Sequence, residues 1–370
     1  MVLTGPRQSG KTTLVRSTFP EKPYVNLEAL DVRQRAIEDP RGFLDSFPEG
    51  AILDEVQRAP DLLSYIQVDV DENRQRGRWI LTGSQNLLLL SGVSQSLAGR
   101  AALLELLPFS VPELRRGGWL ADDLFSLLWR GSYPAVFDRG EDPSEWLASY
   151  VATYVERDVR QTLAVGDLLS FQTFLRLAAA RTGQLLNLSQ LGSDAGITHN
   201  TAKSWVGVLE ATFVALRLAP FHRNLGKRLV KTPKLHLLDS GVACHLLGIR
   251  SPDELRLHPL RGAIFESWVV SEILKAHHAA GRAPRLSFFR DAHGLELDLM
   301  VEWGTDLAGV EVKSGATLPL EMFTPLESVA RWVPELRSRV IVYGGATSWD
   351  SKRGRALSYR DIDDFDWVKS

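Results

Sequence analysis

The chain has 370 residues, which is enough for two or three domains that each bury a core of their own. Its formal net charge of −2 excludes a protein that is basic throughout, so any contact with nucleic acid must come from a local patch. A single cysteine excludes an internal disulfide, and no apolar run is long enough to span a bilayer, so we expect a cytoplasmic protein without a membrane partner.

The first strong motif follows Val2–Thr4, a short apolar segment that is predicted to be a buried strand. The next residues, Gly5–Thr12, fit a glycine, four free positions and then Gly-Lys-Ser/Thr. Small residues let backbone N–H groups turn toward an anion, and a helix beginning near Lys11 would direct its positive end at the same point. We therefore expect a phosphate-binding loop that holds ATP and Mg²⁺. The residues assigned to it are Gly5, Pro6, Arg7, Gln8, Ser9, Gly10, Lys11, Thr12 and Thr13.

A second apolar run, Ala51–Glu55, ends in two acids. In phosphate-loop ATPases such a strand delivers one carboxylate to the Mg²⁺ shell and a second that polarises the attacking water. We assign the first role to Asp54, which would share the Mg²⁺ ion with the hydroxyl of Thr12. Glu55 is then the predicted catalytic base.

A third apolar segment, Trp79–Thr82, leads into small polar residues. Ser84 is our first choice, and Asn86 our second, for the residue that orients the hydrolytic water; a turn that merely leaves the sheet is the alternative. Arg100 precedes another apolar segment and is a candidate arginine finger, acting in its own subunit or in a neighbouring one. A surface salt bridge is the alternative role for Arg100.

Together these motifs resemble a large prokaryotic family of AAA-type ATPases. The resemblance is carried by Leu3–Thr13, Leu53–Gln57, Leu81–Ser84 and Ala98–Arg100. It implies a domain that binds ATP and Mg²⁺ and hydrolyses ATP, followed by a conserved C-terminal domain of unassigned function. The family's usual leader before the first strand is missing, which we expect to affect nucleotide affinity rather than nucleotide identity. AAA-type modules often form rings, so a homo-oligomer is a candidate assembly.

The segment Leu188–Trp205 predicts two short helices separated by a tight turn at Gly196. This arrangement is typical of a helix-turn-helix. One face of the second helix, with Ala202, Val206 and Leu209, is predicted to be core. The outward residues expected to reach the bases or phosphates of double-stranded DNA are His199, Asn200, Lys203 and Ser204.

Residues 211–238 hold six cations and no acid. These cations are Arg217, Arg223, Lys227, Arg228, Lys231 and Lys234. Two apolar runs flank a turn at Gly226, so the segment is predicted to be the wing of a winged helix, with a phosphate-contacting stripe that includes Arg223, Lys227 and Arg228. Winged helices also dock proteins, so DNA binding and pure scaffolding both stay open.

In the last third, a helical segment from Phe265 precedes three predicted strands near residues 287–290, 295–299 and 309–314. Side chains two apart on a strand point the same way, so Glu311 and Lys313 should share a face. A carboxylate on one strand and Glu-x-Lys on the next resembles the PD-(D/E)xK nuclease superfamily over residues 260–345. The resemblance implies Mg²⁺ ligands from Asp298 and Glu311, a further ligand from Glu266 and a water-positioning role for Lys313. An inert edge strand with a Glu311–Lys313 salt bridge is the alternative.

The predicted fold class is α/β: a P-loop parallel sheet, a helical middle with a winged helix-turn-helix, and a restriction-endonuclease-like domain. The predicted domains span residues 1–140, 141–250 and 251–370. We predict an ATPase whose nucleotide state is coupled to a DNA-binding C-terminal region. The alternatives are a Mg²⁺-dependent nuclease regulated by ATP and a non-catalytic nucleotide-switched binding protein.

Overall fold

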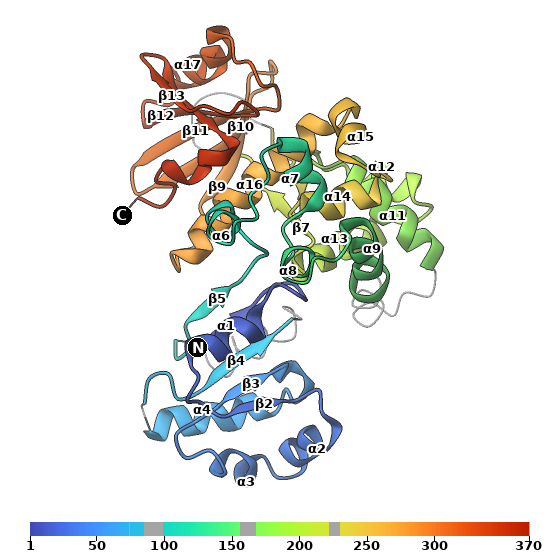
Figure 1. The fold of residues 1–370 in the computed structure, drawn as a ribbon, viewed down its shortest axis with the longest axis vertical. Helices are drawn as coiled ribbons and strands as arrows, with labels where there is room; N and C mark the ends of the chain where they lie inside the picture. The colour runs from blue at the N-terminus through green and yellow to red at the C-terminus, as the bar shows by residue number, and fades with distance from the viewer. Residues whose placement is uncertain (74, 85–98, 156–167, 222–229, 370) are drawn as a thin grey trace. The chain divides into compact units, whose positions relative to one another are not determined.

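The computed structural model describes residues 1–73, 75–84, 99–155, 168–221 and 230–369 (Figure 1). The chain divides into two compact units, residues 1–108 with 211–213 and residues 109–210 with 214–370. The division into three domains at residues 140 and 250 stays a prediction. Among the described residues, no helix combines the length and apolarity needed to cross a membrane.

The first unit is built on a five-stranded sheet in the order β2-β3-β4-β1-β5, with every neighbouring pair parallel. The predicted parallel α/β sheet is therefore confirmed. Its strands are β1 (Val2–Thr4), β2 (Tyr24–Asn26), β3 (Ile52–Asp54), β4 (Ile80–Gly83) and β5 (Leu103–Glu105). Its helices are α1 (Lys11–Thr18), α2 (Leu30–Glu38), α3 (Pro40–Asp45), the 3₁₀ turn η1 (Val56–Arg58) and α4 (Leu62–Asn73).

Both faces of this sheet are buried, which explains the continuous apolar runs in the sequence. Successive residues of β3 point to opposite faces: Ile52 packs in a cluster with Val15 of α1, whereas Leu53 packs in a cluster with Phe43 and Leu62. In a parallel sheet covered on both sides, the carboxyl ends of all strands meet at one edge. Residues that follow β1, β3 and β4 therefore lie close together.

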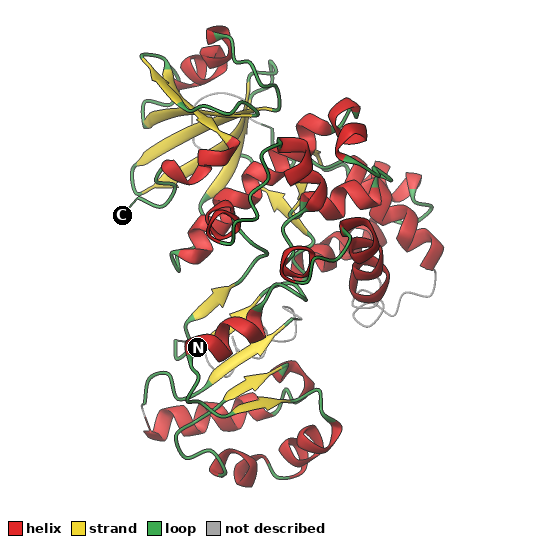
Figure 2. Ribbon diagram, viewed as in Figure 1, coloured by secondary structure: helices red, strands yellow, loops and turns green. Residues whose placement is uncertain are grey.

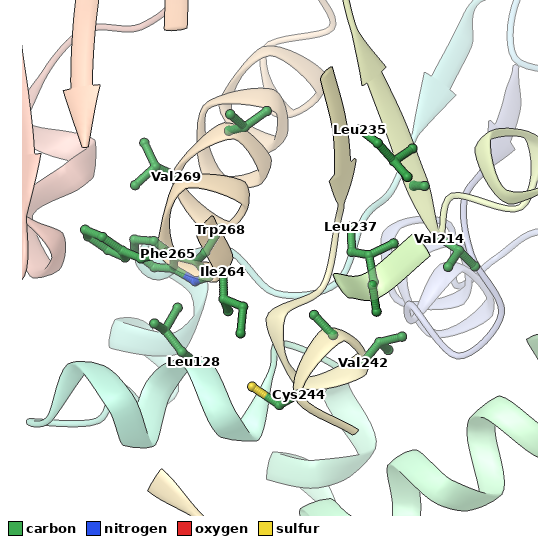
Figure 3. Packing of buried hydrophobic residues seen from close by; sticks show 14 of the residues in the cluster. Leu128, Val214, Leu235, Leu237, Val242, Cys244, Ile264, Phe265, Trp268 and Val269 are labelled. Atoms are coloured by element: carbon green, nitrogen blue, oxygen red, sulfur yellow. The ribbon is translucent and has the colours of Figure 1, made fainter. Parts of the chain in front are cut away.

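The second unit begins with short helices that share one apolar core with α16 (Figure 3). In that core Leu128 and Cys244 lie beside Ile264 and Phe265, so segments far apart in the sequence are packed together. The helices of this region are α6 (Val111–Arg116), α7 (Leu124–Arg130), α8 (Pro134–Asp138), α9 (Pro143–Tyr150), the π-helical turn η2 (Val151–Val155), α11 (Leu168–Ala180), α14 (Ser240–Leu246), α15 (Pro252–Leu257) and α16 (Arg261–Ala279).

Between these helices lies a three-stranded antiparallel sheet in the order β6-β8-β7. The predicted helix pair and strand pair are both present. Their bounds are β6 (Gln184–Leu185), α12 (Leu188–Asp194), α13 (His199–Ala211), β7 (Ala215–Leu218) and β8 (Lys234–Leu237). On α13, Ala202, Val206 and Leu209 are buried as predicted.

The chain ends in a six-stranded mixed sheet of order β13-β14-β12-β11-β10-β9 (Figure 2). Because β11 pairs with β10 on one side and β12 on the other, the edge position in the alternative interpretation is wrong, whereas the Glu311–Lys313 salt bridge that it expected is present. The elements are β9 (Leu286–Arg290), β10 (Glu296–Trp303), β11 (Asp306–Lys313), η3 (Leu320–Phe323), α17 (Thr324–Ala330), β12 (Leu336–Tyr343), β13 (Trp349–Ser351), β14 (Gly354–Ser358) and η4 (Tyr359–Asp364).

Helices cover both faces of this second sheet. On β12, Val340 and Val342 belong to the core shared with α16, whereas Ile341 packs in a separate cluster with Leu326 of α17. The sheet is therefore a buried layer, and polar side chains within it must find partners inside the protein.

Candidate functional site

The loop after β1 makes a tight turn that needs glycine at its start. Gly5 has φ +150°, and a Cβ added there would lie 2.1 Å from the carbonyl oxygen of Leu106. Gly10, with φ +93°, caps α1 directly before Lys11. Gln8 also adopts a positive φ, so the backbone between β1 and α1 curls around a point next to the first turn of the helix. This is the geometry of an anion-binding loop.

Lys11 folds back across that loop. Its Nζ donates to the carbonyl oxygens of Gly5 at 3.0 Å and Pro6 at 2.6 Å, and its side chain is buried. Lys11 therefore places a positive charge inside the loop, and its role as a phosphate ligand stays a prediction.

Asp54, at the end of β3, is a buried carboxylate that accepts hydrogen bonds from several hydroxyl groups. Its Oδ2 accepts from Thr12 Oγ1 at 2.8 Å and from Tyr24 OH at 2.7 Å, and its Oδ1 accepts from Thr82 Oγ1. The two predicted Mg²⁺ ligands, Thr12 and Asp54, are thus brought together. Carboxylate and hydroxyl oxygens are ligands that Mg²⁺ prefers, so this donor set fits the ion.

Glu55 follows with a left-handed backbone, φ +57°, at the point where β3 ends and η1 begins. Its Oε2 accepts from Ser84 Oγ at 3.2 Å and from Gln57 Nε2. Burial raises the pKa of Glu55, while the nearby charges of Arg7 and Lys11 lower it. The first-choice polar residue Ser84 therefore contacts the predicted catalytic base, whereas Asn86 lies outside the described residues.

Arg100 lies elsewhere in the same unit. Arg100 lies before the amino end of β5, and β5 runs parallel to β1. The phosphate loop follows the carboxyl end of β1, so the two lie at opposite edges of the sheet. Arg100 forms an exposed ion pair with Asp71, as in the salt-bridge alternative. A finger role within its own subunit is not supported by this position, and a role in a neighbouring subunit stays a prediction.

Sequence reasoning did not find Tyr24, Gln57 and Thr82. Tyr24 and Thr82 bond to Asp54 and Gln57 bonds to Glu55. Tyr24 lies on β2 and Thr82 on β4, the two strands that flank β3. A polar residue within each of these apolar strands was the sequence signal that could have indicated them.

On α13, the residues predicted to face outward are exposed: His199, Asn200, Lys203 and Ser204. Thr198 Oγ1 accepts from Thr201 N at 3.1 Å and so caps the helix. Arg223, Lys227 and Arg228 lie outside the described residues.

Two other cations do not form the predicted surface stripe. Arg217 pairs with Glu210, with Nη2 and Oε2 2.6 Å apart. Lys234 is only 2% exposed, so its assignment to a phosphate-contacting stripe is wrong. Burial of β8 between β6 and β7 and against α16 turned this lysine inward.

The predicted C-terminal carboxylates are close enough to influence one another. Burial and the charge of Asp298 raise the pKa of Glu266 to about 8 and that of Glu311 to about 7. Burial also raises the pKa of Asp298, whose Oδ2 accepts from Val312 N at 2.8 Å. Lys313 Nζ lies 2.7 Å from Glu311 Oε2, so these two side chains share a face as predicted. Within the described ranges, no group of three or more His, Cys, Asp or Glu side chains is arranged to hold a metal ion.

Two mycobacterial relatives span most of the chain. The uncharacterized proteins Mb2031c of Mycobacterium bovis and Rv2008c of Mycobacterium tuberculosis are each 32% identical to it over 321 residues, which is 86% of this chain and 70% of theirs. Residues 1–115 match the AAA domain family. The chain belongs to a family of AAA-domain proteins.

The AAA domain contains every residue of the nucleotide site described above, from Gly5 to Ser84. Two domains of unknown function follow it in this AAA-domain protein, DUF8612 at residues 121–253 and DUF4143 at residues 261–362. The solved structure of protein VC1899 from Vibrio cholerae covers 98% of this chain and 95% of its own, with 12% identity and a TM-score of 0.22. That score is too low to establish a common fold.

Proposed function

We propose that this AAA-domain protein binds ATP with Mg²⁺ and hydrolyses it. The observation that carries the proposal is the buried Asp54 carboxylate, bonded to Thr12 and followed directly by Glu55, which lies against Ser84. Thr12 and Asp54 would hold Mg²⁺, which would neutralise charge on the phosphate oxygens when bound.

Different side chains of the protein would bind the phosphates and activate the attacking water. Lys11 and the loop amides would bind the phosphates, and Glu55 would accept a proton from the attacking water while Ser84 orients that carboxylate. The raised pKa of Glu55 suits this role, because it brings the carboxylate closer to the pH at which it works. The loop residues proposed to contact the nucleotide are Gly5, Pro6, Arg7, Gln8, Ser9, Gly10 and Thr13.

Phosphate release and ATP binding test this proposal together. Wild type should release phosphate with Mg²⁺ and ATP, Lys11→Ala should lose both ATP binding and release, and Glu55→Gln should bind ATP without turnover. Release that is unchanged in Lys11→Ala would contradict ATP hydrolysis at this loop. Binding without any release by wild type would favour the nucleotide-switched binding protein instead.

We further propose that residues 168–237 form a winged helix that binds double-stranded DNA. The element order α11, β6, α12, α13, β7, β8 supports it, as does the exposure of His199, Asn200 and Lys203. Nucleotide state at the AAA domain would favour one of two arrangements of this region. Arg223, Lys227 and Arg228 would add phosphate contacts. Binding to duplex DNA that survives loss of Lys227 and Arg228, or that ignores salt, would contradict DNA binding by this wing.

We also propose a cytoplasmic homo-oligomer in which Arg100 of one subunit acts on the ATP bound by its neighbour. Mixing Arg100→Ala with Lys11→Ala tests this: restored phosphate release in the mixture would support action between subunits. The alternative of a Mg²⁺-dependent nuclease needs a metal at Asp298 and Glu311, and the Lys234 ammonium 4.0 Å from Asp298 Oδ1 speaks against it.

A further inference from the structure

One buried ammonium lies among the carboxylates of the C-terminal region. Lys234 Nζ is 2.9 Å from Glu266 Oε1, 2.5 Å from Glu296 Oε1 and 4.0 Å from Asp298 Oδ1. The lysine comes from β8, and the carboxylates come from α16 and β10. The Nζ also lies 5.4 Å from the centre of the Phe288 ring, and the lysine is buried, so its charge is held away from solvent.

An imidazole nitrogen that could act as a metal ligand faces the same carboxylates. His236, two residues along β8, is fully buried, and its Nε2 lies 4.0 Å from Glu266 Oε1. That Nε2 has no hydrogen-bond partner among the described residues, whereas Nδ1 lies 3.0 Å from Ser267 Oγ. Carboxylates and an imidazole nitrogen are the donor types that a divalent metal would take. The position between them is filled by an ammonium.

We infer that the Lys234 ammonium is the resident cation of the cluster formed by Glu266, Glu296 and Asp298, and that it takes the place of a divalent metal. A buried carboxylate needs an opposite charge close by, and the lysine supplies it. A metal entering the same cluster would face the repulsion of that ammonium at close range in a weakly screened site. The C-terminal domain then cleaves no phosphodiester by metal-assisted chemistry.

The remaining predicted ligand is paired in the same way. Glu311 holds Lys313 at 2.7 Å, and the charges of both lysines lower the pKa of Asp298 against the effect of its burial. Lysines thus flank the central carboxylate. Because Lys234 belongs to the three-stranded sheet, its ion pairs also join β8 to α16 and to the six-stranded sheet. The cluster is a structural joint between these elements.

Mn²⁺ binding to the full-length protein without nucleotide, followed by electron paramagnetic resonance, tests the inference. Wild type, Lys234→Met and the control Lys231→Met, which removes an exposed lysine of the same segment, are compared. All three keep the same AAA domain, so any Mn²⁺ held there cancels. We expect Lys234→Met to bind one Mn²⁺ more than wild type, and its melting temperature to rise more than that of wild type on adding Mn²⁺. Lys231→Met should match wild type in both measurements.

The gained site should disappear in Lys234→Met/Asp298→Asn. Should Lys234→Met fail to fold, the charge-balanced Lys234→Met/Glu296→Gln is measured by the same criteria. No gain of Mn²⁺ in a folded Lys234 variant would overturn the inference. The inference would also be overturned if wild type bound Mn²⁺, or nicked plasmid, in a way that Asp298→Asn abolishes. These outcomes are independent of ATP hydrolysis, which is measured at the other domain.

Discussion

Thr12 Oγ1 donates to Asp54 Oδ2 across 2.8 Å, which joins the first turn of α1 to the end of β3. Both side chains are predicted Mg²⁺ ligands, and they come from segments 42 residues apart. Their hydrogen bond means that the AAA domain holds them near one another through its own contacts, which would reduce the rearrangement that binding of the proposed ion requires.

Tyr24 positions one of these two ligands, so Tyr24→Phe should weaken Mg²⁺ binding. Burial and the bond to Asp54 raise the pKa of the Tyr24 phenol, so it donates to Asp54 at any ordinary pH. Loss of a hydrogen bond to a metal ligand typically costs about tenfold in metal affinity. We expect the Mg²⁺ concentration for half-maximal phosphate release to rise about tenfold, with kcat retained at saturating Mg²⁺. Tyr65→Phe in the same unit is the control, and an equal shift there would contradict this role.

Ser84→Ala tests the contact with Glu55. Because Ser84 Oγ donates to Glu55 Oε2 at 3.2 Å, its loss should misplace the base rather than the nucleotide. We expect kcat for ATP hydrolysis to fall about tenfold while KM for ATP stays the same. Ser64→Ala, at an exposed position on α4, should leave both constants unchanged. A rise in KM with kcat unchanged would show instead that Ser84 serves binding.

The nucleotide site was largely readable from the sequence because each of its main parts is local. Val2–Thr4 and Ala51–Glu55 are continuous apolar runs, and the glycine pattern before Lys11 requires only neighbouring residues. The bond from Tyr24 to Asp54 was not readable, since it depends on which strands become neighbours in the sheet.

The position of Lys234 could not be predicted from the sequence. It lies in a segment with cations and no acid, so local composition indicates a surface. Its partners Glu266 and Asp298 are far along the chain, and only packing of β8 against α16 brings them to it. The strand pattern did predict that Glu311 and Lys313 share a face, because alternation along one strand is again a local property.

Lys203→Ala tests the proposed DNA-binding face of α13. Lys203 is exposed and would contact a phosphate, so its loss should weaken binding to all duplex sequences alike. We expect the slope of log affinity against log salt concentration to fall by about one. Titrations of labelled duplex at several salt concentrations measure it. Lys352→Ala, another exposed lysine of the same unit, is the control; equal weakening by both variants would contradict a specific role for α13.

A buried ion pair holds residues 109–132 to α16, and breaking it should destabilise the second unit. Lys275 Nζ lies 2.6 Å from Glu272 Oε1 and donates to the carbonyl oxygen of Phe109, while Glu272 Oε2 accepts from Val111 N. Lys275→Met leaves the Glu272 carboxylate buried without its counter-charge. We expect the free energy of unfolding to fall by about 3 kcal/mol, measured by denaturant titration with tryptophan fluorescence.

The control for this prediction is an exposed ion pair. Arg139 Nη1 lies 3.7 Å from Glu141 Oε1 in a solvent-exposed position, so Arg139→Ala should cause no measurable change. Similar losses from Lys275→Met and Arg139→Ala would mean that burial of the first pair does not determine its contribution.

His278, near the end of α16, should make the protein less stable in mild acid. Burial, and then the neighbouring His277, lower its pKa from 6.5 to about 4. Between these two values the unfolded chain binds a proton that the folded chain does not, so stability falls as the pH falls from 6.5 to 4. The slope from this group is at most about 1.4 kcal/mol per pH unit.

Because other groups add slopes of their own, the quantity to measure is the difference in stability between wild type and His278→Asn. The variant should lose less stability over this range, whereas His199→Asn, at an exposed position on α13, should follow wild type. Parallel curves for wild type and His278→Asn would show that His278 takes up its proton equally in the folded and unfolded states.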